Sequence, residues 1–176
     1  MFGFKCGGEF KTQWYRWDGY LSGTGQDVID FLASVSNSGD LERLRDNCKL
    51  VQVVDSGGYI DRDAENPVKG FLEDIYRGKT KELLTFWDEE DWGNVAYGYI
   101  IDLDESKFKV FSPAGVPGTE LPRYEKLPEY QPYDRYQPEL VYERDFQDIL
   151  KYDDWIDNFN RQIKCDQYKC DELQNC

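Results

Sequence analysis

Residues 14–32 constrain the fold more than any other part of the chain, because three kinds of local structure follow one another there. The window begins as an aromatic run, passes through a turn that contains Gly19, Gly23 and Gly25, and ends in apolar residues at helical spacing. Glycine adopts backbone angles that other residues avoid for steric reasons, so the chain can turn tightly and its amides can face a common point. The window therefore predicts a strand, a tight turn and a helix in direct succession.

The segments on either side of the turn carry the matching patterns. Residues 9–17 are rich in aromatic side chains and threonine, and they alternate like a strand with at least one buried face. After the turn, Thr24 is followed three residues later by Asp27, which is typical of a helix N-cap with a carboxylate in the first turn. The helix is expected to end near residues 36–39. Its apolar stripe comprises Val28, Ile29, Phe31, Leu32 and Val35.

A second helix and a short strand are predicted next. Residues 40–48 place Leu41, Leu44 and Cys48 on one helical face, with charged side chains on the other. Residues 50–54 form a β-branched run that a serine and two glycines close, which indicates a strand followed by a turn.

A third helix is predicted to begin at Asn66 and Pro67. Asparagine caps a helix N-terminus, and proline has the backbone angle of the first helical position. Gly78 is expected to end this helix. Residues 81–87 fit a strand or a short helix, and periodicity does not separate the two.

Residues 94–109 carry the clearest β-hairpin signal, with alternating apolar residues on both sides of an acidic turn. Six of the seven prolines follow in residues 112–138, interleaved with tyrosines. Proline at this density prevents a regular helix or an inner strand, so this segment is expected to be an extended strap.

Residues 144–163 are predicted to form one long amphipathic helix near the C-terminus. Its expected apolar stripe comprises Phe146, Ile149, Tyr152, Ile156, Phe159 and Ile163. The predicted fold is therefore a single α+β domain over residues 1–164, an antiparallel sheet with packed helices, followed by a polar, cysteine-containing tail at residues 165–176. A chain of 176 residues is long enough to bury roughly two-thirds of its extended surface.

The net charge of the chain limits the classes of partner that it is expected to bind. Lys and Arg number 21 and Asp and Glu 35, which gives a formal net charge of −14. Such a surface repels nucleic acid and anionic membranes, so direct binding to either is not expected. A basic protein is the expected partner, for instance one whose natural ligand is nucleic acid. The alternative is that the acidic charge only keeps an aromatic-rich protein soluble.

The chain shows no apolar run of signal-peptide length and none near the roughly twenty residues of a membrane-spanning helix. The expected location is the cytoplasm. Five cysteines, an odd number, fit reduced thiols better than a disulfide framework.

Catalytic and metal-binding signatures are incomplete. The chain has no histidine, so no Ser-His or Cys-His pair exists. Cys165, Cys170 and Cys176 lack the usual two-residue zinc spacing, and a zinc site needs Cys6 or Cys48 as well. No catalytic residue, metal or cofactor is predicted. Carboxylates at Asp102, Asp104 and Glu105, or at residues 88–91, can act in acid-base pairs or bind a hard cation, but solvated turn residues are the default interpretation.

Two candidate binding sites follow. The first is the acidic surface, whose spaced carboxylates can imitate phosphates for a protein that binds nucleic acid through Lys and Arg. Its residues are Asp88, Glu89, Glu90, Asp91, Asp145, Asp148, Asp153, Asp154 and Asp157.

The second candidate, an alternative function, is a small-ligand or nucleotide site at the glycine-rich turn. Its residues are Arg16, Trp17, Asp18, Gly19, Tyr20, Gly23 and Gly25. Neither phosphate signature is complete there, because Gly25 is followed by Gln26 and Asp27 instead of Lys-Ser/Thr, and Val28 stands where the dinucleotide pattern has Gly or Ala. A structural turn is the favoured interpretation. A structural virion or assembly component is a third class, which a defined oligomer would reveal.

The glycine-rich opening resembles that of a largely uncharacterised family of small phage and bacterial proteins. That family begins Tyr-x-x-Asp-Gly-Tyr-Pro-x-Gly-x-Gly and continues into a helix, and residues 15–25 here read Tyr-Arg-Trp-Asp-Gly-Tyr-Leu-Ser-Gly-Thr-Gly. Leu21 replaces the family's proline, and residues 97–103 are similar to its later hairpin. The resemblance implies an intracellular, virus-borne protein and carries no activity with it.

Overall fold

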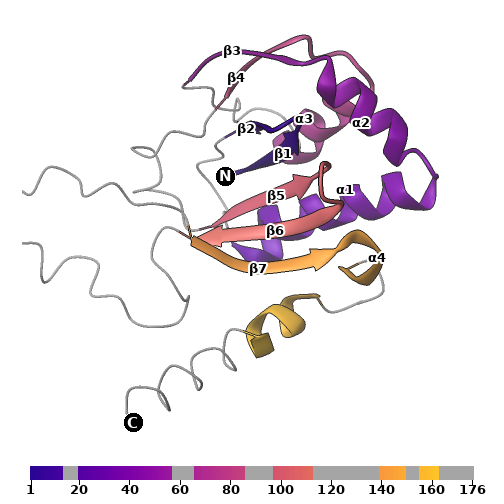
Figure 1. Ribbon diagram of the computed structural model, residues 1–176. Coiled ribbons are helices and arrows are strands. Elements are labelled where there is room, and N and C mark those ends of the chain that lie inside the picture. The colour runs from indigo at the N-terminus through magenta and orange to yellow at the C-terminus, as the bar shows by residue number, and fades with distance from the viewer. Residues whose placement is uncertain (14–19, 57–65, 86–96, 113–138, 150–154, 163–176) are drawn as a thin grey trace, which may run out of the picture.

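The computed structural model describes residues 1–13, 20–56, 66–85, 97–112, 139–149 and 155–162 (Figure 1). Strands are β1 (Phe2–Cys6), β2 (Glu9–Gln13), β3 (Gln52–Ser56), β4 (Glu82–Thr85), β5 (Gly98–Asp102), β6 (Lys107–Ser112) and β7 (Glu139–Asp145). Helices are the π-helical turn η1 (Leu21–Gly25), α1 (Gln26–Asn37), α2 (Leu41–Lys49), α3 (Pro67–Tyr76) and α4 (Phe146–Ile149). A further helix covers residues 155–162.

Five strands form the main sheet in the order β2-β1-β5-β6-β7. Strand β1 pairs in parallel with β5, whereas the other three pairs are antiparallel. Strands β3 and β4 form a separate parallel pair. The predicted α+β class is confirmed, and the sheet is mixed but mostly antiparallel. The parallel pairing of β1 and β5 needs a long crossover, which includes helices α1 to α3.

One face of the sheet carries the apolar core. Directly opposed residues of paired strands point to the same side, and the register aligns Phe2 with Tyr99. Phe2 contacts Phe71 of α3 edge to face, and Phe4 contacts Phe31 of α1 in the same manner. Helices α1 and α3 therefore pack on this face beside β1 and β5 (Figure 1).

The helix at residues 155–162 packs on the same face, further along the sheet. The ring of Trp155 lies 5.7 Å from that of Phe108 in β6, and the ring of Phe159 lies 5.4 Å from that of Tyr142 in β7. All four side chains are buried. This aromatic cluster holds the C-terminal helix against β6 and β7.

Local patterns predicted three helices and the hairpin correctly. The stripe of α1 is buried, as are Leu44 and Cys48 of α2. The side chain of Asn66 caps α3 by accepting a hydrogen bond from the Lys69 amide at 2.9 Å, and Gly78 follows the helix with a φ of 68°. Between the two structures left open for residues 81–87, the chain forms strand β4.

The prediction that Thr24 caps α1 is wrong. The turn η1, which is kinked by non-helical backbone angles at Gly23, leads directly into α1, so Gly25 occupies the cap position of α1, and no side chain caps it. Thr24 is buried instead. Asp27 does lie in the first turn of α1, as predicted.

The prediction of one helix from residue 144 is wrong at its start. Arg144 and Asp145 belong to β7, which pairs with β6 over most of its length. Helical structure begins only at Phe146, whose amide donates to the Ser106 carbonyl at 3.0 Å. Pairing with a strand distant in sequence therefore overrides the local helical period.

Strand β1 was not predicted. Gly7 and Gly8 have φ values of 65° and 78° and form the two-residue turn between β1 and β2. The proline-rich strap, the tail at residues 165–176 and the three tail cysteines lie outside the described residues. Among the described helices, none has the length and apolarity needed to cross a membrane.

Candidate functional site

Three residues of the predicted acidic surface are described, and all three are exposed. Asp145 ends β7, Asp148 lies in α4, and Asp157 lies in the helix at residues 155–162. These elements follow one another along one edge of the main sheet (Figure 1). The other six residues, at positions 88–91, 153 and 154, lie outside the described residues.

The segment that carries these carboxylates is acidic overall. Residues 139–162 contain seven Asp and Glu against three Lys and Arg. Two of those bases interact with their own segment: the Arg144 guanidinium lies 5.0 Å from the centre of the Tyr142 ring, and Arg161 donates to the Asp157 carbonyl. Local contacts of this kind hold the bases close to the chain while Asp145, Asp148 and Asp157 remain exposed.

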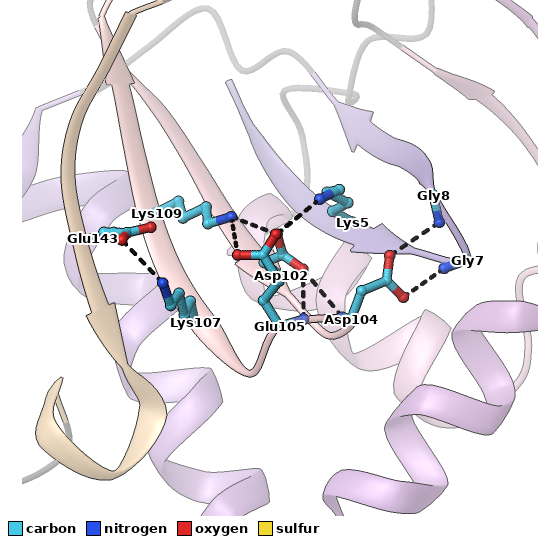
Figure 2. A network of polar contacts seen from close by, with 9 residues as sticks. All are labelled: Lys5, Gly7, Gly8, Asp102, Asp104, Glu105, Lys107, Lys109 and Glu143. Carbon is cyan, nitrogen blue, oxygen red and sulfur yellow. Dashed lines mark hydrogen bonds and ion pairs between the residues drawn. The ribbon is translucent and has the colours of Figure 1, made fainter.

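A second group of charges lies at the β5–β6 turn and is internal (Figure 2). The side chain of Asp102 is fully buried, and its Oδ2 atom accepts hydrogen bonds from Lys109 at 2.8 Å and from Lys5 at 3.2 Å. Its Oδ1 atom accepts from the amides of Asp104 and Glu105. Glu105 pairs with Lys109 at 2.8 Å as well. The interpretation of Asp102 as a solvated turn residue is therefore wrong.

The protonation states of this group follow from its contacts. Burial raises the pKa of the Asp102 carboxyl, but hydrogen bonds from Lys109, the Glu105 amide and Lys5 outweigh it, so the pKa lies below its usual value. Burial lowers the pKa of Lys109, but the hydrogen bonds and charges of Asp102 and Glu105 raise it by more, so the pKa lies above its usual value. Both groups are ionised at neutral pH, whereas a general acid or base works best with a pKa near the operating pH. The arrangement suits a structural ion pair.

Neighbouring contacts extend this internal group. The Asp104 carboxylate accepts hydrogen bonds from the amides of Gly7 and Gly8, at 2.8 and 3.0 Å, and so joins the β1–β2 turn to the β5–β6 turn (Figure 2). Arg45 of α2 donates to the Leu103 carbonyl at 3.0 Å and to Ser106. Two hairpin turns and one helix are held together at this end of the sheet.

In the described part of the glycine-rich turn, the two glycine amides are already occupied. Both Gly23 and Gly25 donate to the carbonyl of Tyr20, at 3.2 and 3.3 Å. These amides therefore do not converge on a common external point. The Tyr20 side chain is exposed, and Arg16, Trp17, Asp18 and Gly19 lie outside the described residues.

Gly25 has a different role from the one its sequence context suggested. Its backbone angles, φ −61° and ψ −45°, are ordinary helical values. A Cβ atom at this position would lie 2.8 Å from the Tyr99 ring and 3.0 Å from the Trp155 ring. Glycine is therefore needed at residue 25 for close packing and not for an unusual backbone angle.

Sequence reasoning missed the buried pair of Asp102 and Lys109. The hairpin does carry a signal, since charged residues at positions 105, 107 and 109 alternate on β6 and its turn. Lys109 lies only seven residues from Asp102, but the third member of the group, Lys5, is 97 residues away in sequence, so the burial of the group was not visible locally. Among the described residues, no three His, Cys, Asp or Glu side chains gather closely enough to hold a metal ion.

Comparison with known proteins gives no relative: no family model, no curated protein and no solved structure matches the chain.

Proposed function

We propose that this chain is a non-enzymatic protein-interaction module that binds a basic protein through its acidic surface. The observation that carries the proposal is a net charge of −14 together with three exposed carboxylates on consecutive elements, Asp145, Asp148 and Asp157. The expected partner binds nucleic acid or acts in defence, and the chain acts as an inhibitor that imitates nucleic acid. A phage-encoded protein of the host cytoplasm fits this role.

The electrostatic argument depends on charges that face solvent. Lys11 and Lys109 are buried, against one buried carboxylate, Asp102, among the described residues. Burial therefore removes at least as much positive as negative charge from the described surface. A basic partner that normally neutralises phosphates would be attracted at long range, with a strong dependence on salt.

The glycine-rich turn receives less support as a ligand site. An anion site there would need the Gly23 and Gly25 amides, and both donate to Tyr20. Binding of a protein partner through the acidic surface is therefore the candidate function that the described geometry favours.

The experiment uses the immobilised full-length chain and a bacterial lysate, with retained proteins identified by mass spectrometry. Binding of each retained protein is then measured against increasing salt and against competing duplex DNA. The proposal expects a basic partner whose binding weakens steeply with salt and is competed by the duplex. Binding that is indifferent to both would discard it.

A charge-matched pair of variants tests whether the surface is specific. The first variant replaces Asp145, Asp148 and Asp157 with lysine. The second replaces Asp30, Asp46 and Glu82, which are also exposed but lie on α1, α2 and β4. Both variants change the net charge equally, so the proposal expects loss of binding in the first and retention in the second. Equal losses would mean that total charge alone causes binding.

A further inference from the structure

Two cysteine side chains distant in sequence meet inside the protein. Cys6 ends β1, and Cys48 lies in the last turn of α2. Both are buried, and neither is in a disulfide. The Cys6 thiol donates to the Arg45 carbonyl of α2 at 3.8 Å. Because a helical side chain lies over the turn that precedes it, the Cys48 side chain covers the turn that contains Arg45, and the two thiols lie beside each other. Strand β1 and helix α2 therefore bring the two sulfurs to the same buried point of contact.

The two thiols are not equivalent. Interaction with the neighbouring Cys48 thiol lowers the pKa of the Cys6 thiol to about 7, against the opposing effects of burial and of Asp104. The same interaction, with burial, raises the pKa of the Cys48 thiol. Cys6 is thus the sulfur that ionises first, and the Cys48 thiol stays protonated beside it.

A buried lysine adds to this difference. The ammonium group of Lys11 in β2 donates to the Cys48 carbonyl at 2.7 Å, and the Lys11 side chain is almost fully enclosed. The charges of Lys11 and Lys49 both favour the Cys6 thiolate. A thiolate beside a lysine and a protonated second thiol has the charge environment of a reactive cysteine with its resolving partner, but here, unlike in exposed sensor cysteines, both side chains are buried.

We infer that Cys6 and Cys48 are a redox modification site, at which a peroxide converts the thiol pair into a reversible disulfide that ties β1 to α2. This inference is independent of the acidic surface and of its partner.

The chemistry balances with hydrogen peroxide as the oxidant. The Cys6 thiolate attacks a peroxide oxygen, an S–O bond forms, the O–O bond breaks, and hydroxide leaves and takes up a proton to become water. The Cys48 sulfur then loses its proton and attacks the Cys6 sulfur. The S–S bond forms, the S–O bond breaks, and the departing hydroxide takes that proton. Two thiols and one peroxide give one disulfide and two waters.

Burial determines which reagents can act. Cys6 is 1% exposed and Cys48 is fully buried, so a small neutral oxidant reaches them more readily than a bulky disulfide. A dithiol reductant is expected to restore the thiols only as fast as this part of the structure opens.

The test is peptide mapping of the full-length chain after peroxide treatment, without reduction. Trypsin cleaves after Lys5, Lys11, Arg45 and Lys49, so the expected product joins residues 6–11 to residues 46–49 and is two hydrogen masses lighter than the reduced pair. Reduction should separate the two peptides. Recovery of both peptides unlinked, or of either one linked elsewhere, would overturn the inference.

Two variants define the roles. In Cys48→Ser, no resolving thiol is present, so the Cys6 sulfenic acid should accumulate and react with dimedone roughly tenfold more than in the wild-type chain. Equal dimedone labelling of Cys48→Ser and the wild-type chain would contradict the assignment of Cys6 as the reacting thiol and Cys48 as the resolving thiol. The matched control carries serine at Cys165, Cys170 and Cys176, and it should form the linked peptide in undiminished yield. Loss of the linked peptide in this control would show that the tail cysteines are required. If Cys48→Ser fails to fold, peptide mapping of the wild-type chain still decides the inference.

Discussion

Asp102 is the buried carboxylate that pairs with both lysines of the charged group at the β5–β6 turn. Its two carboxylate oxygens accept hydrogen bonds from Lys5, from Lys109 and from two amides of its own turn. Lys5 lies on β1 and Lys109 on β6, so a single side chain of β5 connects three adjacent strands. Removing one member of a buried, hydrogen-bonded charge group is costly because the remaining charges lose their partner.

The first prediction concerns Asp102→Asn, which keeps the shape of the side chain and removes its charge. Lys109 would keep Glu105 as a partner, but Lys5 and Lys109 would lose their common buried carboxylate, at a cost of roughly 3 kcal/mol in the free energy of unfolding. Urea unfolding followed by tryptophan fluorescence measures the change. The control is Glu105→Gln, whose side chain faces solvent, so that its screened ion pair with Lys109 should contribute much less to the free energy of unfolding. Equal effects of the two variants would contradict the structural role of Asp102.

The second prediction is the pH dependence of that contribution. The pKa of the Asp102 carboxyl is depressed in the folded protein, whereas in the unfolded chain it is about 4. A carboxyl group whose pKa is lower in the folded protein contributes its full stabilisation at pH values above its unfolded pKa. This contribution to the free energy of unfolding is lost as the pH falls through the folded pKa. The pKa of Lys109 is raised in the folded protein, so its contribution to the free energy of unfolding is present at low and neutral pH. It is lost only as the pH rises above about 10.

The difference in unfolding free energy between the wild-type chain and Asp102→Asn should therefore be constant from about pH 5 to pH 9 and decrease below about pH 4. Unfolding curves over this pH series measure it. A difference that stays constant into strong acid would mean that the Asp102 charge is not its source.

The third prediction uses two helical glycines with different surroundings. Alanine favours a helix over glycine by about 1 kcal/mol, so substitution should stabilise wherever space allows. At Gly25 the new methyl group would collide with Tyr99 and Trp155, and overpacking of this kind costs about 1–3 kcal/mol. At Gly70 of α3 nothing lies within 4 Å of the new atom. Thermal unfolding should show destabilisation in Gly25→Ala and stabilisation in Gly70→Ala, and effects of the same sign would refute the packing role of Gly25.

At the scale of elements, the sequence predicted what local periodicity determines. Helices α1, α2 and α3 were visible because each buries a stripe whose period and cap lie within one segment. Strand β7 was not visible, because its pairing with β6 connects residues that lie 27 to 38 positions apart, from Ser112 with Glu139 to Lys107 with Asp145. The same holds for the parallel pairing of β1 with β5.

The features of the candidate sites likewise fall into those that local sequence predicts and those that depend on tertiary contacts. The exposure of Asp145, Asp148 and Asp157 was predictable, since charged side chains default to solvent. The burial of Asp102 and the meeting of Cys6 with Cys48 were not, because both depend on tertiary contacts between distant elements. Trp155 likewise was missing from the predicted apolar stripe, although it is buried against β6.

The fourth prediction concerns the cap of α3. The Asn66 side chain accepts a hydrogen bond from the Lys69 amide, one of the donors that a helix N-terminus leaves unpaired. Asn66→Ala should lower the free energy of unfolding by about 1 kcal/mol, whereas Asn66→Ser should retain most of the stability. Chemical denaturation of both variants tests this. If serine and alanine were equally destabilising, the capping bond would not be the cause.

At the scale of the whole molecule, two electrostatic effects oppose each other. The excess of fourteen negative charges repels itself and destabilises the compact state, and salt screens this repulsion. Salt also weakens attractive surface pairs such as Arg77 with Glu73, but each of these contributes little. The buried contacts of Asp102 are screened least. The net effect of salt on stability is therefore set by self-repulsion.

The fifth prediction follows from this balance. Raising the salt concentration shortens the Debye length from about 30 Å at 0.01 M to about 8 Å at 0.15 M, so the thermal unfolding midpoint of the wild-type chain should rise over this range. A variant with asparagine at Asp145, Asp148 and Asp157 carries three fewer negative charges and should show a smaller rise. Scanning calorimetry at several concentrations of sodium chloride measures both slopes. A midpoint that falls with salt would mean that attractive pairs dominate, and it would leave the acidic surface with too little uncompensated charge to attract a basic protein at long range.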